Sequence, residues 1–214
     1  MNRLPRLLFP LLFSLSACSG LYYSGLEKIG IPKREVMVHR VEKARDTQEE
    51  TKEQFKSALD QFRAVTRFQG GDLEATYDRL NGEYEASAKK AEEVRYRIRE
   101  IEDVSDALFN EWKNEITQYS NASLKRSSQA KLRDTKTQYR QLINAMKNAE
   151  AKIEPVLTVF RDQVMFLKHN LNAQAIASLK TELGSINNDV SNLIAAMERS
   201  INEANAFIRT MENK

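Results

Sequence analysis

The 214-residue chain has little of what covalent or metal-held scaffolds require: it contains one Cys and two His. One Cys cannot close an intrachain disulfide, and the three residues together cannot supply a Cys/His cluster for structural zinc. Gly and Pro are also scarce, at 7 and 4 residues, which excludes collagen-like sequences. What is abundant is charge: 29% of the residues are Asp, Glu, Lys or Arg, beside 41% apolar residues. This balance predicts a soluble, helix-rich polypeptide of one or two domains.

The N-terminus has the pattern of an export signal. Arg3 and Arg6 precede the apolar run 7–15, and these two parts correspond to the basic and apolar regions of a signal peptide. The run has nine residues and is too short to cross about 30 Å of hydrocarbon as a helix. We therefore expect a cleaved signal peptide over residues 1–17.

The four residues that end in Cys18 resemble the lipobox of bacterial lipoproteins. They read Leu-Ser-Ala-Cys, and Cys18 is the only Cys of the chain. The resemblance implies that Cys18 becomes the first residue of the mature protein and carries acyl chains such as palmitate. Ser19, rather than Asp, resembles the pattern that is passed to the outer membrane, which implies an envelope protein facing the periplasm. The alternatives are an ordinary secretory signal with an incidental Cys, or a cytosolic protein with an apolar N-terminus.

Cleavage would change the charge balance. The whole chain has 33 Lys and Arg, and removing Arg3 and Arg6 leaves 31 against 30 Asp and Glu. The mature chain would be close to neutral, which disfavours nucleic acid as a partner because phosphate binding without sequence preference requires excess cationic charge.

Residues 18–33 are expected to form a lipidated tether. Four Gly and Pro residues lie between positions 19 and 33, so a continuous helix is not expected there. Leu21, Tyr22 and Tyr23 could rest among lipid headgroups, or they could pack on the end of the folded domain. The sequence leaves these alternatives open.

The rest of the chain, residues 34–214, shows apolar residues at alternating steps of three and four, which is typical of coiled-coil helices. Breaks near positions 70, 121 and 171 divide it into helices of about 34–69, 72–119, 123–169 and 173–213, with Asp72 as a helix cap. Apolar pairs across each break have residue numbers with a constant sum, 142, 240 and 343 in turn, as antiparallel hairpins require. The predicted fold is all-α: an elongated up-down-up-down antiparallel four-helix bundle. Pro155 predicts a kink near residues 151–155.

No catalytic, cofactor-binding or metal-binding set is apparent in the sequence. A di-iron bundle needs Glu three residues before His, but Val36 precedes His39 and Phe166 precedes His169 at that spacing. Phosphate-loop, dinucleotide and nucleophile-elbow motifs are missing too. We expect no enzyme, no cofactor and no metal, and both His residues at the surface or at helix ends. The polar residues at core positions, Gln48, Ser87, Ser105 and Thr135, are interpreted as tolerated spacing.

One local concentration of positive charge stands out. Two interpretations apply to it: a site for phosphate, or ion pairing across the hairpin, where the 240 register places acidic residues opposite. We favour pairing. The basic residues are Lys125, Arg126, Lys131, Arg133, Lys136 and Arg140, and the expected pairs are Glu115 with Arg126, Glu111 with Lys131, Asp106 with Lys136 and Glu102 with Arg140.

The hairpin of the second and third expected helices extends further than the first and fourth helices beside it. Residues 109–129 are expected to project by about 15 Å past the start of the first helix and the end of the fourth. This tip, with Trp112, Tyr119, Lys125 and Arg126, is predicted to approach the membrane or a partner seated there.

A lipobox followed by a wholly helical body resembles an uncharacterised family of exported bacterial helical lipoproteins whose domain has no assigned function. The leading hypothesis is a non-enzymatic envelope lipoprotein that acts as a spacer, scaffold or partner-binding rod, anchored to the membrane through Cys18 and bound to an envelope protein. The alternative is a helical module that binds nucleic acid or another phosphate-rich polymer through residues 125–140. A third hypothesis, a ligand-binding bundle, needs a pocket beside Gln48 and Thr51 or beside Ser105 and Thr135. The sequence also leaves homo-oligomers open.

Overall fold

The computed structural model describes residues 23, 25–26, 30–67, 72–170 and 173–212, and within these ranges the chain is helical with no strand. The all-α prediction is confirmed, with helix ends within a few residues of those expected. The helices are α2 (Lys33–Thr66), α3 (Leu73–Gln118), α4 (Ala122–Ala151), α5 (Ile153–His169) and α6 (Ala173–Glu212).

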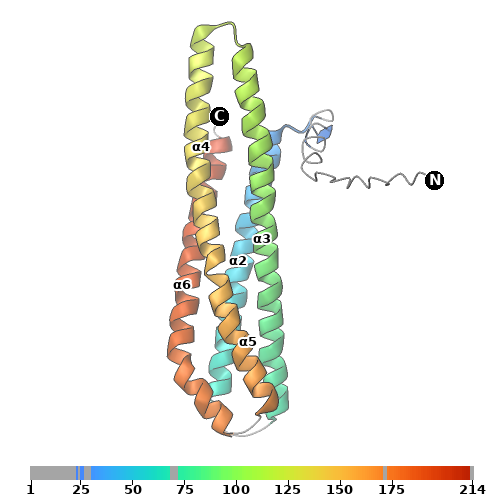
Figure 1. Ribbon diagram of the computed structural model, residues 1–214, viewed down its shortest axis with the longest axis vertical. Coiled ribbons are helices and arrows are strands. Elements are labelled where there is room, and N and C mark those ends of the chain that lie inside the picture. Colours follow the sequence, from blue (N-terminus) through green and yellow to red (C-terminus); the bar gives the residue numbers. More distant parts are fainter. Residues whose placement is uncertain (1–22, 24, 27–29, 68–71, 171–172, 213–214) are drawn as a thin grey trace, which may run out of the picture.

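The helices form an elongated up-down-up-down bundle in which α4 and α5 together make the third arm (Figure 1). Helix α2 packs against α3 and α6, and the α4–α5 arm packs against the same two helices. Among the described residues, no Cα of α2 lies within 8 Å of one in α4 or α5. Helix α2 and the α4–α5 arm are therefore diagonal neighbours, so their outward faces point in opposite directions.

Local signals set where the helices begin. The Asp72 side chain accepts a hydrogen bond from the backbone N–H of Ala75 at 3.0 Å, which confirms the expected cap of α3. Asn121 caps α4 in the same way, accepting from Ser123 and Leu124 at 2.9 and 3.1 Å. These bonds satisfy backbone donors that have no partner within the helix, so they fix the turns of the bundle.

The third arm is broken at Lys152, three residues before Pro155, which confirms the predicted kink. Proline has no backbone donor and clashes with the preceding turn, so α4 ends one turn before it. Arg95 of α3 spans the break and donates to Glu150 of α4 at 3.1 Å and to Glu154 of α5 at 2.8 Å. The bonds to Glu154 and then Glu150 raise the pKa of the Arg95 guanidinium.

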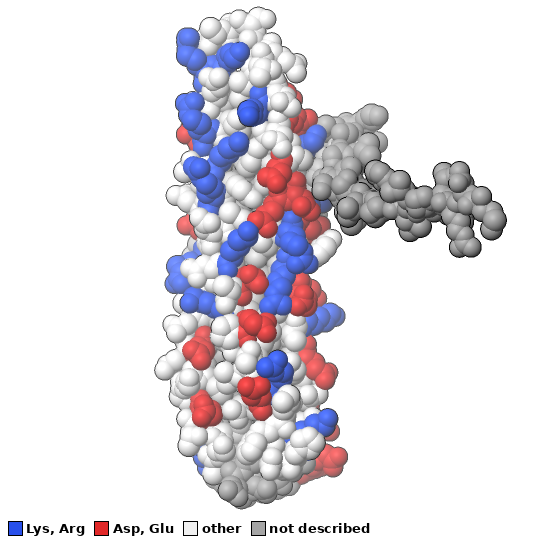
Figure 2. Space-filling view, in the orientation of Figure 1, with Lys and Arg blue, Asp and Glu red and all other residues white. Residues whose placement is uncertain are grey.

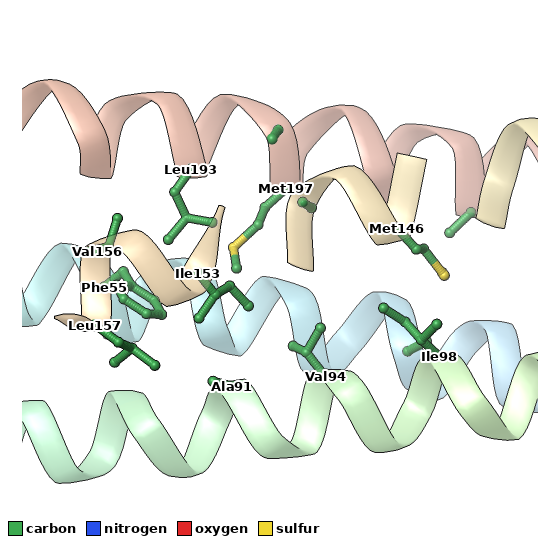
Figure 3. Packing of buried hydrophobic residues seen from close by; sticks show 14 of the residues in the cluster. Phe55, Ala91, Val94, Ile98, Met146, Ile153, Val156, Leu157, Leu193 and Met197 are labelled. Carbon is green, nitrogen blue, oxygen red and sulfur yellow. The ribbon is translucent and has the colours of Figure 1, made fainter. Parts of the chain in front are cut away.

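A single apolar core runs along the rod, and Figure 3 shows how it is filled. Side chains from all five helices point into the space between them, including Phe55 of α2, Val94 of α3, Met146 of α4, Ile153 of α5 and Met197 of α6 (Figure 3). Each of these five is at most 1% exposed, so all four arms contribute to one core.

The polar residues expected at core positions are buried there. Ser87, Ser105 and Thr51 satisfy their hydroxyls by donating to carbonyl oxygens of the preceding turn, at 2.6–2.8 Å. Gln48 differs. It is 1% exposed, and among the described residues neither its amide nitrogen nor its amide oxygen has a hydrogen-bond partner. The buried hydroxyl of Ser200 on α6 is equally unpartnered within this part of the chain. The bond from Arg45 to Asn205, at 3.3 Å, shows the register of α2 and α6, in which Gln48 and Ser200 lie at about the same level.

Replacing Gln48 by Met should raise the free energy of unfolding by about 1–2 kcal/mol, because it removes two unpaired polar atoms at nearly constant volume. Urea unfolding followed by circular dichroism measures the change. Gln129→Met, at an exposed position of α4, is the control and should change stability by no more than about 0.5 kcal/mol. A loss of stability in Gln48→Met would show that the amide is hydrogen-bonded in solution.

Candidate functional site at the α3–α4 tip

The hairpin of α3 and α4 extends past the neighbouring helix ends. Lys33, the first residue of α2, pairs with Glu111 at 3.1 Å, so the last two turns of α3 lie beyond the start of α2. Met211, one residue from the end of α6, lines a pocket together with Lys131. The tip is therefore a two-helix hairpin of about 10–15 Å without α2 or α6 beside it, as expected (Figure 1).

The structure brings the four predicted tip residues to this hairpin. The indole N–H of Trp112 donates to the Ser128 hydroxyl at 2.9 Å, which joins α3 to α4. Tyr119 is 42% exposed, Lys125 is half-exposed and Arg126 is exposed. Leu124, an apolar residue that is 56% exposed in the first turn of α4, also belongs to the tip but was not predicted from the sequence. Its signal was its position about two turns before the buried stripe of α4 begins at Leu132.

A surface pocket of about 380 Å³ lies where the tip leaves the four-helix region. Apolar and aromatic groups line it together with charges of both signs, which suits a protein side chain better than a uniformly charged ligand. The lining residues include Arg34, Trp112, Glu115, Tyr119, Leu124 and Met211.

The basic residues of α4 do not form the expected pairs. Among the described residues, none of the four predicted acid–base pairs is present, and no ion pair involves any of the six cations. Glu102 instead pairs with Lys147, one heptad further along α4 than Arg140. The reason is that two heptad patterns match at several registers: Trp112 meets Ser128 near the turn, but Phe109 packs edge-on against Tyr139 at 5.4 Å.

Three of these cations form a regular row. Arg126, Arg133 and Arg140 are seven residues apart, so they lie on one face of α4 about 10.5 Å from each other. All three are exposed, and Figure 2 shows Lys and Arg gathered along α4. We call these three residues the arginine row. Lys136 is close to it but extends over the ring of Phe109, 5.3 Å from the centroid.

The chain preceding α2 is held against the side of the rod. Tyr23 is only 2% exposed, and its hydroxyl accepts a hydrogen bond from Arg40 Nη1 at 2.8 Å. The same Arg40 atom donates to the carbonyl oxygen of Glu100 at 2.7 Å. Of the two alternatives that the sequence left open for Tyr23, packing on the folded domain is confirmed and a position among lipid headgroups is wrong. Leu21, Tyr22 and Cys18 lie outside the described residues.

Both histidines lie at the surface of the rod. His39 and His169 are exposed, the second at the last position of α5, as predicted. In the part of the chain that the structure describes, no three His, Cys, Asp or Glu side chains are grouped closely enough to hold a metal ion. The helices of that part also include none long and apolar enough to cross a membrane.

The fold and the tip define an elongated antiparallel four-helix bundle with a projecting hairpin. The model of one family, described as protein of unknown function DUF2959, matches residues 22–211. The chain belongs to this family. No curated protein matches it.

Proposed function

We propose that the protein is a lipid-anchored, non-enzymatic rod of the bacterial envelope that works by binding a protein partner. The sequence Leu-Ser-Ala-Cys ending at Cys18 carries this proposal, because the chain's only Cys stands where a lipobox requires it. Acyl chains on Cys18, palmitate among them, would hold the rod on the membrane, since several chains bind far more stably than one. Ser19 supports an outer-membrane location facing the periplasm.

The α3–α4 tip is the surface we assign to the partner. Its exposed groups, Tyr119, Leu124 and Arg126, combine aromatic, aliphatic and guanidinium character. Trp, Tyr and Arg are the residues most enriched at the centres of protein interfaces. The pocket beside Trp112 gives a partner side chain a place to enter. Spacing or scaffolding follows from the same geometry, because α3 has 46 residues and is about 69 Å long.

A second candidate function is the binding of a phosphate-rich polymer through residues 125–140. The observation that favours it is the absence, among the described residues, of any ion pair to the six cations in this segment. Arginine presents paired N–H donors that match phosphate oxygens. The near-neutral mature chain and the absence of aromatic residues from positions 125–138 weigh against single-stranded nucleic acid, whose bases stack on aromatic rings.

The partner-binding proposal predicts position-specific crosslinking in the source bacterium. A photoreactive phenylalanine in place of Leu124 should give a crosslinked protein adduct in the membrane fraction. Met165 of α5 is the matched control, because it is also 56% exposed but lies near the opposite end of the rod. Adducts from both positions, or from neither, would contradict a partner site at the tip.

A further inference from the structure

We infer that the rod lies along the membrane surface, with the edge formed by α2 and α3 toward the lipid and the arginine row directed away from it. This rests on the proposed anchoring at Cys18. The observation behind it is the clamp that holds Tyr23 against the side of the rod.

The clamp fixes where the tether leaves the domain. Arg40 bonds to both Tyr23 and Glu100, and its guanidinium carbon lies 5.4 Å from the centre of the Tyr23 ring. Leu26 packs against the apolar core, and its carbonyl oxygen accepts from the Ile31 N–H at 3.0 Å. The chain is therefore attached to the rod at the level of Glu100. The attached residue, Tyr23, precedes the first residue of α2 by ten positions.

The distance that the anchor can reach is set by chain length. Cys18 is five residues from Tyr23, and five residues span at most about 17 Å when fully extended. From Glu100, the tip end of α3 at Gln118 is 18 residues away, or about 27 Å. The opposite end at Leu73 is 27 residues away, or about 40 Å.

An upright rod is incompatible with these lengths. If the tip stood on the membrane, Tyr23 would lie about 27 Å above it, and a reach of about 17 Å would leave Cys18 about 10 Å short. Sinking the tip into the hydrocarbon would not close the gap, because Lys113 and Arg126 are exposed there and charged side chains are costly in lipid. Standing on the other end leaves a larger gap. The rod axis must therefore lie within about 40° of the membrane plane.

The clamp also selects the face that meets the membrane. Tyr23 sits on the edge between α2 and α3, and two of the exposed large apolar residues are on the same flank. Ile31 is 36% exposed and lines a pocket with Arg97, whose guanidinium lies 5.4 Å from the centre of the Tyr96 ring. Tyr96 is itself 51% exposed, and amphipathic aromatic side chains are favoured at the headgroup level.

The arginine row is on the arm diagonal to α2. A reach of about 17 Å from Tyr23 cannot bring the anchor around a four-helix bundle to the outer face of α4. The row therefore faces the aqueous compartment, where it can meet an anionic partner other than the membrane that holds the anchor.

Energy transfer from the two rod ends tests this orientation. The purified acylated chain is reconstituted in liposomes that carry an acceptor dye on their headgroups, with a donor on Glu74→Cys at one end or on Ser120→Cys at the tip. Both positions are exposed, and acylated Cys18 has no free thiol. A lying rod keeps both donors within about 45 Å of the headgroups, so both should transfer energy efficiently. A membrane-bound chain whose Glu74→Cys donor lies about 65 Å or more away would overturn the inference.

Releasing the clamp should change the result. Tyr23→Ala removes the clamp and lengthens the free tether as far as Leu26, which still packs on the core, so transfer from Glu74→Cys should fall while the chain stays in the liposome fraction. Tyr84→Ala is the control, because Tyr84 is a half-buried tyrosine of α3 that is not part of the clamp. This substitution should leave transfer unchanged. Unchanged transfer in Tyr23→Ala would also overturn the inference. Because only acylated protein is used, failure here is distinct from failure of the anchoring itself.

Discussion

Replacing Phe160 by Ala is expected to lower the free energy of unfolding by about 3–5 kcal/mol. Phe160 is 2% exposed, and its ring stacks on those of Phe55 and Phe62, with centroids 6.3 Å away in both cases. Truncation would remove both ring contacts and leave a cavity between α2 and α5. These two helices are diagonal neighbours whose backbones do not approach closely, so no nearby backbone can fill the space.

Phe166→Ala on the same helix is the control. Phe166 is 41% exposed, so its loss should cost no more than about 0.5 kcal/mol. Urea denaturation of both variants at neutral pH gives the comparison. Equal effects of the two substitutions would show that the three-ring stack does not support the core.

The helices and their antiparallel order could be predicted because they depend on the apolar pattern alone. A stripe at steps of three and four specifies a helix and its buried face, and short breaks specify antiparallel neighbours. The buried positions of Gln48 and Thr135 followed from their place in that stripe. The break before Pro155 followed from the chemistry of one residue.

The ion pairs of α4 could not be predicted, because heptad patterns match at registers seven residues apart. Pairing Glu102 with Arg140 or with Lys147 satisfies the apolar stripe equally well, and only core packing, such as Phe109 on Tyr139, selects between them. Long Lys and Arg side chains add further freedom, and a single exposed pair contributes only about 0–1 kcal/mol toward fixing the register.

The docking of Tyr23 was left open by the sequence for a different reason. The segment around it is short, interrupted by Gly and Pro, and has no periodicity from which a buried face could be read. Its place depends on tertiary contacts, among them the hydrogen bond from Arg40, which also bonds to Glu100 of α3, 60 residues away from it. The tip residues were placed correctly on a projecting hairpin because helix lengths alone determine that projection.

The anchoring of the chain at Cys18 is the claim on which the functional proposals depend. Acylation would make membrane attachment strong, because each buried methylene contributes about 0.8 kcal/mol and a lipoprotein Cys would carry more than one chain. Replacing Cys18 by Ser should therefore move essentially all of the protein out of the membrane fraction.

The measurement is palmitate labelling with cell fractionation and intact mass of the wild type and Cys18→Ser, with Ser19→Ala as the neighbouring control. We expect wild type and Ser19→Ala to carry label, begin at residue 18 and sediment with membranes, and we expect Cys18→Ser to be unlabelled and to remain soluble. An unlabelled wild-type chain that retains residues 1–17 and stays in the soluble fraction would contradict anchoring at Cys18.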